Sequence, residues 1–174
     1  MTLREKYGEW GIILGATEGV GKAFCERLAK EGMNVVMVGR REEKLKELGE
    51  ELKNTYEIDY KVVKADFSLP DATDKIFAAT ENLDMGFMAY VACLHSFGKI
   101  QDTPWEKHEA MINVNVVTFM KCFYHYMKIF AAQDRGAVIN VSSMTGISSS
   151  PWNGQYGAGK AFILKMTEAV ACET

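Results

Sequence analysis

Tyr156 and Lys160 are the two side chains of this sequence whose spacing points most directly to proton-transfer chemistry. They are four positions apart, so a helix would place the phenol and the ammonium on one face. A phenol with a pKa of about 10 is a poor base at neutral pH. We expect the neighbouring cation to stabilise the phenolate and to lower that pKa. Tyr156 would then exchange a proton with the oxygen of an alcohol or ketone.

Ser143 supplies a hydroxyl group upstream of this pair, directly after an apolar run that ends at Val141. In an open parallel sheet, ligands bind at the carboxyl ends of the strands, so Ser143, Tyr156 and Lys160 are expected to converge there. Ser143 would donate a hydrogen bond to the substrate oxygen and orient it. Taken alone, a tyrosine and a lysine at this spacing are also a common surface pairing.

A glycine-rich loop follows the first apolar run, in the sequence Gly-Ala-Thr-Glu-Gly-Val-Gly. Glycines at such a turn let the backbone approach a pyrophosphate, which the free N–H groups of the following helix then bind. The alternative is a plain turn, but the position between a strand and a helix favours a dinucleotide cofactor. The candidate residues are Gly15, Thr17, Gly19, Val20 and Gly21, and Tyr156 and Lys160 join them because the lysine would also hold the ribose hydroxyls.

The end of the second predicted strand favours NADP (NADPH) over NAD. An NAD site needs an acidic residue there for the ribose 2′-hydroxyl, whereas this sequence has Gly39 followed by Arg40 and Arg41. Two guanidinium groups suit a 2′-phosphate. The alternative is that the arginines pair with the two glutamates that follow them. Glu18 in the glycine loop is unfavourable to a phosphate, so we expect the arginines and the Thr17 hydroxyl to hold it.

Apolar runs alternate with helical patterns along the chain, which predicts an α/β fold. Strands are predicted at residues 10–14, 34–38, 60–64, 86–91 and 137–141. Helices are predicted from about residue 20 to Gly32, at 42–54, 71–83 and 104–132, and from about 155 to the end of the chain. Nearly continuous apolar strands indicate a parallel sheet covered on both faces. Right-handed crossovers make it a doubly wound, Rossmann-type sheet.

Length and composition favour a small globular protein with a small-molecule ligand. The 174 residues fit one domain, 1–174, and the net charge of −3 without a basic block argues against nucleic acid and anionic membranes as partners. Four dispersed cysteines suit reduced, buried thiols, and three histidines form no metal-ligand pattern with them. A charged amino terminus and short apolar runs predict neither a signal peptide nor a membrane span, so we expect a cytoplasmic protein without a metal.

These motifs together resemble the short-chain dehydrogenase/reductase family over most of the chain. The resemblance implies hydride transfer between a nicotinamide cofactor and a secondary alcohol or ketone. It also implies that Asn115 supports a water-linked proton path to the lysine and that Asp66 contacts the adenine. A polar helix residue and a turn-forming aspartate are the plainer alternatives for these two.

Three further runs, at residues 7–10, 84–98 and 148–155, resemble bacterial members of the family that act on bile acids. This resemblance implies that the substrate carries a 7β-hydroxy or a 7-oxo group. The alternatives are another ketone or 3-oxoacyl reductase, and a non-catalytic NADP-binding fragment. Trp152, Met144, Ile147 and Phe97 would suit an apolar wall for a sterol, although packing in the core is favoured for the last two.

The sequence departs from the family pattern at three places. Leu14 precedes the glycine loop where many members have threonine, and Tyr-Val-Ala-Cys at 90–93 replaces an Asn-Asn-Ala-Gly segment, so we assign its side chains no role. The chain also stops at Thr174, whereas the family continues into two more strands and a substrate-covering segment. We therefore expect an incomplete domain with weak or no activity and with its fifth strand at an open edge.

By analogy with the family, the complete protein is expected to be a homodimer or homotetramer. The two longest predicted helices would supply the contact, with the apolar residues Phe119, Phe123, Phe162 and Met166 lying either in the interface or in the core.

Overall fold

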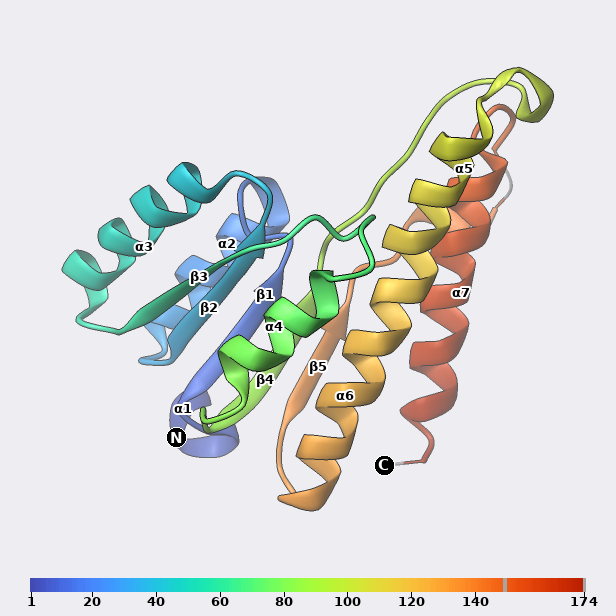
Figure 1. Ribbon diagram of the computed structural model, residues 1–174. Coiled ribbons are helices and arrows are strands. Elements are labelled where there is room, and N and C mark those ends of the chain that lie inside the picture. The colour runs from blue at the N-terminus through green and yellow to red at the C-terminus, as the bar shows by residue number, and fades with distance from the viewer. Residues whose placement is uncertain (149, 174) are drawn as a thin grey trace.

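A computed structural model describes residues 1–148 and 150–173 and contains one five-stranded sheet (Figure 1). The strands are β1 (Trp10–Leu14), β2 (Asn34–Gly39), β3 (Tyr60–Lys64), β4 (Met85–Tyr90) and β5 (Ala137–Asn140). They lie in the order β3-β2-β1-β4-β5, and every neighbouring pair is parallel. The expected Rossmann-type sheet is confirmed, and β5 lies at its edge as predicted.

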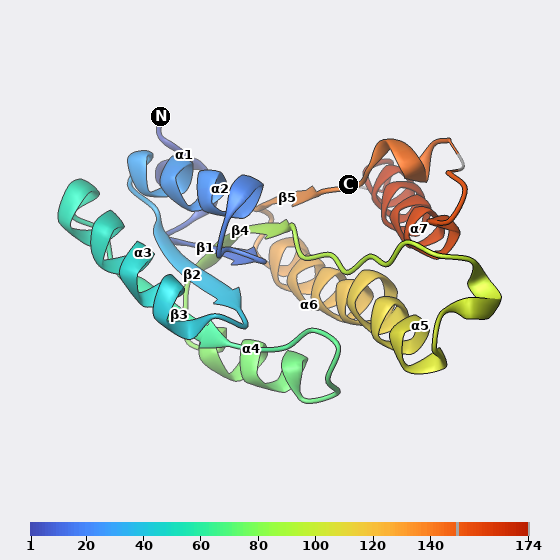
Figure 2. The same ribbon diagram turned by 90° about the horizontal axis from the view of Figure 1, so that it is seen from above.

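Helices cover both faces of the sheet (Figure 2). They are α1 (Leu3–Tyr7), α2 (Gly19–Lys30), α3 (Glu42–Tyr56), α4 (Ala72–Thr80), α5 (Trp105–Ile112), α6 (Phe119–Ala132) and α7 (Gly154–Val170). The pair α2 and α3 packs on one face, and α4 and α6 pack on the other, with α7 beside α5 (Figures 1 and 2). From β1 the chain adds β2 and β3 on one side of the sheet, and it then returns to add β4 and β5 on the other side of β1. A crevice opens at such a switch point, here between β1 and β4.

Alternation along the strands divides the core into two layers, because successive side chains of a strand point to opposite faces. Ile12 and Leu14 of β1 pack in the layer that holds Ile76 of α4, whereas Ile13 packs with Leu28 of α2. All five of these side chains are buried. Both faces of the central strands are thus apolar, as the predicted parallel sheet requires.

The predicted helices are correct in position but differ from the structure in three details. The short helix α1 was not predicted, although Thr2 and Glu5 form a capping box at its start. The stretch 104–132 is interrupted by a π-helical segment (η2, Asn113–Thr118) between α5 and α6. The last helix ends at Val170, and turns follow it. Gly32 does end α2, with a φ of 78° that favours glycine.

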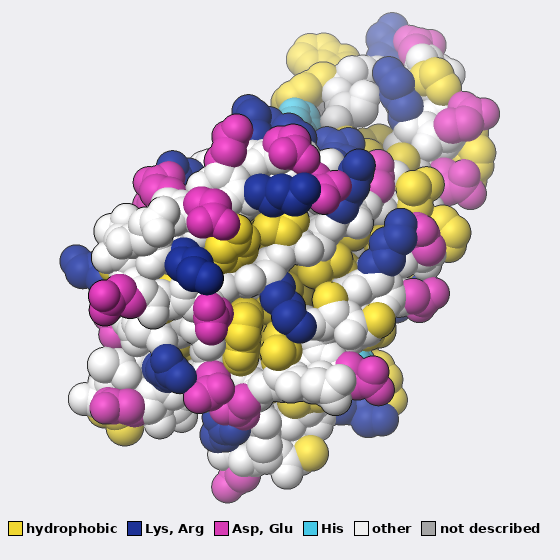
Figure 3. Space-filling model, turned by 60° about the vertical axis from the view of Figure 1, so that its left-hand side comes forward, with side chains coloured by type: hydrophobic (Ala, Val, Ile, Leu, Met, Phe, Trp, Pro, Cys, Tyr) yellow, Lys and Arg dark blue, Asp and Glu magenta, His cyan; other side chains and the backbone are white. Residues whose placement is uncertain are grey.

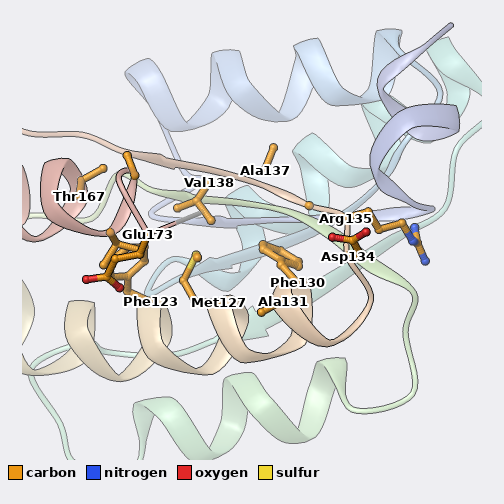
Figure 4. Close-up of a pocket in the computed structure, with 13 residues that line it drawn as sticks. Phe123, Met127, Phe130, Ala131, Asp134, Arg135, Ala137, Val138, Thr167 and Glu173 are labelled. Carbon is orange, nitrogen blue, oxygen red and sulfur yellow. The ribbon is translucent and has the colours of Figure 1, made fainter.

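A groove of about 490 Å³ lies along β5, between α6 and the end of α7 (Figure 4). Phe123, Met127 and Phe130 of α6 face Val138 of β5 in this groove. Phe119 and Phe123 are buried within the core layer of α6, so placing these two in an interface is wrong. Phe162 and Met166 of α7 are half-buried against the same layer.

Charges of both signs are interspersed on the face that Figure 3 shows, with hydrophobic side chains visible between them. Within residues 1–148 and 150–173, no helix is long and apolar enough to cross a membrane. The same residues contain no cluster of three or more His, Cys, Asp or Glu side chains arranged to hold a metal ion. All four cysteines are free, but only Cys25 and Cys122 are buried; Cys93 and Cys172 are exposed, which corrects the expectation of four buried thiols.

Candidate active site

A cleft of about 390 Å³ lies at the carboxyl ends of β1, β2 and β4. It is at the switch point of the sheet, where an open α/β fold binds its ligand. Residues from seven separate segments line it: Gly15, Thr17, Glu18, Val20, Gly39, Arg40, Arg41, Asp66, Phe67, Ser68, Val91, Ala92, Cys93, Leu94, Val114, Val141, Ser142, Tyr156 and Lys160.

The glycine loop forms one wall of the cleft, and its tight turn is possible only because glycine has no side chain. Gly15 has a φ of 101°, and a Cβ on it would lie 2.7 Å from the backbone nitrogen of Ala92. A Cβ on Gly21 would lie 2.0 Å from the carbonyl oxygen of Gly15. These contacts bring the start of α2 against the loop, and its unpaired N–H groups favour an anion. The residues present therefore fit a dinucleotide phosphate.

Gly39 closes the end of β2 and excludes the acidic residue that an NAD site would need. A Cβ at this position would lie 2.8 Å from Oγ1 of Thr17, so a larger side chain would displace that hydroxyl. Arg40, which follows it, is exposed and forms no ion pair with any residue that the structure describes.

Arg41 forms an ion pair across the cleft, with 2.9 Å between its Nη2 and Oε2 of Glu18. Pairing of the arginines with the next two glutamates does not occur, so that alternative is wrong. Glu42 instead pairs with Lys46 and Lys64, and Glu43 with Lys46. The acidic residue that contacts an arginine thus comes from the glycine loop.

Tyr156 and Lys160 lie together on the first turns of α7 and line the opposite wall of the cleft. Nζ of Lys160 is 5.8 Å from the centre of the Tyr156 ring and donates a hydrogen bond of 2.7 Å to the carbonyl oxygen of Val141. Lys160 is almost completely buried, and burial lowers its pKa. One backbone carbonyl therefore positions the ammonium beside the phenol.

Ser143 lies beside Tyr156, where the chain leaves β5. Its Oγ accepts hydrogen bonds from the backbone nitrogen and Oγ1 of Thr145, at 3.3 and 3.0 Å. Burial raises the pKa of Tyr156, Cys93 adds to the rise, and a hydrogen bond from Ser143 opposes it. The pKa of Tyr156 is thus raised where a lowering was expected, because burial is the largest cause.

Cys93 is the cleft residue that the sequence interpretation missed, since we had assigned its segment no side-chain role. It is exposed, it lines the cleft, and it raises the pKa of Tyr156. The backbone on either side is fixed: Ala92 donates to the carbonyl of Leu14 at 2.7 Å, and Leu94 is held by Asn115. Its position directly after the last residues of β4 was the available signal.

Asn115 lies in the π-helical segment η2 and is buried behind the cleft. Its Oδ1 accepts from the backbone nitrogen of Leu94 at 3.1 Å, and its Nδ2 donates to the Leu94 carbonyl at 2.6 Å. A Cβ on Gly159 would lie 2.9 Å from Cβ of Asn115, so glycine there allows α7 to approach η2. A π-helical turn at a functional site is a frequent association.

Asp66 lies at the rim of the cleft, where β3 has ended. Its Oδ1 accepts from the backbone nitrogen and the hydroxyl of Ser68, at 3.0 and 2.8 Å. This is the turn-forming arrangement that we weighed as the alternative, and the residue lines the cleft as well.

The four apolar side chains expected to form a substrate wall are exposed, and none of them lines the cleft itself. Phe97, Met144, Ile147 and Trp152 are 69, 75, 72 and 65% exposed, so core packing of Phe97 and Ile147 is wrong. Trp152 has a φ of 61°, and its carbonyl accepts from the backbone nitrogen of Gly98 at 2.9 Å. Trp152 also lines a neighbouring hollow of about 920 Å³ with Ile100 and Trp105. Run 148–155 includes Ser149, which lies outside the described residues, as does Thr174.

The structure brings most of the predicted site residues to one cleft. Eight of them line it: Gly15, Thr17, Val20, Arg40, Arg41, Asp66, Tyr156 and Lys160. Val20, which shares a helix face with Leu28, is half exposed because it faces the cleft rather than the core. Gly19 and Gly21 belong to the same loop, Ser143 adjoins Tyr156, and Asn115 lies behind the cleft with its side chain bonded to the backbone of Leu94.

Three features together define a dehydrogenase site on a Rossmann-type sheet: the glycine loop, the cleft at the switch point, and the cluster of Ser143, Tyr156 and Lys160. The chain belongs to the short chain dehydrogenase family, whose sequence profile matches residues 9–174. Members of this family use NAD or NADP.

Two curated relatives are each called 7β-hydroxysteroid dehydrogenase. The protein from Collinsella aerofaciens is 83% identical over 173 residues, and the one from Clostridium sardiniense is 46% identical over 173 residues. Both alignments cover 99% of this chain, and the chain spans 66% of the length of each relative. One solved structure comes from work on the stereoselectivity of a 7β-hydroxysteroid dehydrogenase. It is 83% identical in sequence and superposes with a TM-score of 0.98, and the match covers 99% of this chain and 69% of that one.

Proposed function

We propose that the protein transfers hydride between NADP and carbon 7 of bile acids, interconverting 7β-hydroxy and 7-oxo groups. The observation that carries the proposal is the convergence of Ser143, Tyr156 and Lys160 on one end of a cleft whose other end carries two arginines. The 83% identity to a 7β-hydroxysteroid dehydrogenase supports the choice of substrate.

NADP would lie along the cleft, with its phosphates at the start of α2 and its 2′-phosphate near Arg40 and Arg41. Support comes from Gly39, where a side chain would collide with the Thr17 hydroxyl, and from the two arginines that follow it at the end of β2 in place of an acidic residue. When bound, the nicotinamide accepts or supplies the hydride. Asp66 and Ser68 would face the adenine end of the cleft.

Tyr156 would exchange a proton between its hydroxyl oxygen and the substrate oxygen. In oxidation, the phenol must first lose its proton, and the hydrogen bond from Ser143 favours the phenolate. Because the Ser143 hydroxyl has one proton, it would donate to the substrate oxygen in place of Tyr156 once the substrate is bound, and so orient it. Lys160, held by the Val141 carbonyl, keeps a positive charge near the phenol and would hold the ribose hydroxyls.

The exposed apolar side chains at the mouth of the site fit a sterol. Phe97, Met144, Ile147 and Trp152 offer apolar surface where a monomeric protein rarely leaves it uncovered. A rigid, apolar ring system would cover such a wall and lose little conformational entropy on binding. A short alcohol would leave it exposed to water.

The protein is further proposed to act in the cytoplasm as a homodimer or homotetramer. Ile112, Val117 and Tyr124 support an interface on α5, η2 and α6, since all three are exposed on these helices.

The test is absorbance at the NADPH band when the full-length protein is mixed with NADP and ursodeoxycholate, a 7β-hydroxy bile acid. We expect NADPH to form from NADP and ursodeoxycholate. Reduced cofactor should form much more slowly when NAD replaces NADP or when the 7α epimer replaces ursodeoxycholate. Formation of NADPH only from short alcohols or 3-hydroxyacyl thioesters would replace the proposed substrate. Tight NADP binding without turnover of any alcohol would make the protein a cofactor-binding module.

A further inference from the structure

Glu18 and Arg41 face each other across the cofactor end of the cleft. Glu18 is the residue immediately before α2, and Arg41 is the residue immediately before α3. Their ion pair of 2.9 Å joins the glycine loop to the end of β2. Both residues line the cleft, so this pair lies in the space that a bound dinucleotide would share.

The guanidinium of Arg41 has one carboxylate partner among the described residues, and that partner is Glu18. Other carboxylates are nearby in the sequence, but lysines occupy them: Glu42 contacts Lys46 at 2.9 Å, and Glu43 contacts Lys46 at 3.4 Å. The Glu18 side chain makes no hydrogen bond to the start of α2, so capping does not explain its position. Its one described polar contact is the guanidinium.

We infer that Glu18 selectively weakens NADP binding by competing with the 2′-phosphate of NADP for Arg41. The inference rests on the proposed use of NADP. A carboxylate and a phosphate both present oxygens that a guanidinium binds, and two such anions repel each other when they approach the same edge of the guanidinium. A 2′-phosphate that binds at this edge must therefore displace Glu18, whereas NAD, which lacks that phosphate, leaves the pair intact.

This competition weakens NADP binding selectively. Arg40, which has no ion-pair partner among the described residues, can bind the phosphate without displacing a carboxylate. The two partners are 74 and 45% exposed, so the pair is a weak one. Its loss should strengthen binding modestly, in keeping with the small contribution of exposed ion pairs.

The experiment compares binding of 2′,5′-ADP and 5′-AMP to the full-length protein by titration calorimetry at one low salt concentration. The two probes differ only in the 2′-phosphate. The variants are Glu18→Gln, Arg41→Ala, Arg40→Ala and the double variant of Glu18→Gln with Arg41→Ala. Glu43→Gln serves as the control, because it removes a carboxylate of the same α3 turn that contacts only a lysine. Thermal melting verifies that each variant is folded.

We expect Glu18→Gln to tighten 2′,5′-ADP binding about two- to fivefold, the range of an exposed ion pair. Binding of 5′-AMP should change by less than that, Glu43→Gln should change neither, and Glu18→Gln should add no selectivity in the Arg41→Ala background. Equal tightening of both probes would overturn the inference, because Glu18 would then act only on the shared 5′-phosphate. No tightening at all would also overturn it. If Arg41→Ala and Arg40→Ala both left the ratio of the two affinities unchanged, the proposed NADP preference itself would fail.

Discussion

The two ends of the sheet use charged side chains in opposite ways. At the amino ends of the strands, Arg135 pairs with Asp84 and donates to the carbonyl of Tyr7 at 2.8 Å. Asp84 also accepts from the backbone nitrogen of Glu9 at 3.1 Å. At the carboxyl ends, Arg40 has no described partner and Arg41 has an exposed one. The amino end satisfies its charges internally, while the carboxyl end leaves them for a ligand.

The difference shows how one sheet separates stability from function. Charge pairs at the amino end join α1, β4 and the loop before β5, so their loss should weaken folding. At the carboxyl end, side chains bond to backbone groups and so position the site, as Asn115 does with Leu94 and Lys160 with Val141. The arginines there stay accessible to a ligand, as expected of binding loops on a rigid scaffold.

The largest expected effect comes from Tyr156→Phe, which removes the hydroxyl that would exchange the proton. Turnover should fall about 10²- to 10⁴-fold, the usual contribution of general acid–base catalysis, while 2′,5′-ADP binding stays the same. Steady-state NADPH formation measures the first and calorimetry the second. Tyr124→Phe, on an exposed part of α6, is the matched control and should leave turnover unchanged. Near-normal turnover of Tyr156→Phe would remove the phenol from the mechanism.

Gly159→Ala tests whether close backbone approach positions the carboxyl end. The added Cβ would meet Cβ of Asn115 at 2.9 Å, so α7 and η2 must separate at a cost of about 1–3 kcal/mol in unfolding free energy. Gly154→Ala on the same helix meets no atom within 4 Å and should be neutral or slightly stabilising. Urea unfolding of the two variants measures both, and equal stabilities would contradict the packing argument.

Asp84→Asn tests the amino end and should leave kcat and KM unchanged. Losing the charge-assisted bond to Arg135 should cost about 1–2 kcal/mol, toward the lower end because both side chains are partly exposed. Burial opposes ionisation of Asp84, but Arg135 and the Glu9 N–H lower its pKa overall. A lowered pKa stabilises the fold above the unfolded value of about 3.9 and loses this contribution as the pH falls through the folded pKa. In urea unfolding at a series of pH values, the stability difference between the wild type and Asp84→Asn should therefore shrink as the pH falls below about 3.9. A difference that stays constant over this range would refute the assignment.

The smallest effect is a displacement of the pH profile by Cys93→Ala. Burial is the main cause of the raised pKa of Tyr156, and Cys93 raises it further. Its removal should lower the pKa of the phenol, so oxidation should reach its plateau at a lower pH. Cys172→Ala, in the exposed turn after α7, is the control. A profile that moves to higher pH would show that the thiol stabilises the phenolate.

The sequence predicted the strands and the long helices because burial imposes a period on apolar residues. It did not reveal η2, since a π-helical turn depends on tertiary contacts such as the approach of Gly159 to Asn115. Helix α1 carried a capping signal in Thr2 and Glu5 but is too short for periodicity to indicate it.

Site residues that belong to a motif with fixed spacing, such as Tyr156 and Lys160, could be predicted from the sequence. Glu18 was foreseen as unfavourable to a phosphate, but its pairing with Arg41 joins two segments that only the sheet brings together. Cys93 belongs to no motif, and the raised pKa of Tyr156 follows from burial, which a sequence does not display.

The exposed indole of Trp152 makes the mouth of the site visible to fluorescence. The chain has three tryptophans: Trp10 is half-buried against the core near the amino end, whereas Trp105 and Trp152 are each 65% exposed. An indole in water emits at longer wavelength than one covered by an apolar molecule. A ligand that covers the apolar wall should therefore shift the emission of Trp152 to the blue, while Trp10 responds only when the sheet itself unfolds. Tryptophan emission alone would thus distinguish ligand binding near Trp152 from unfolding of the sheet around Trp10.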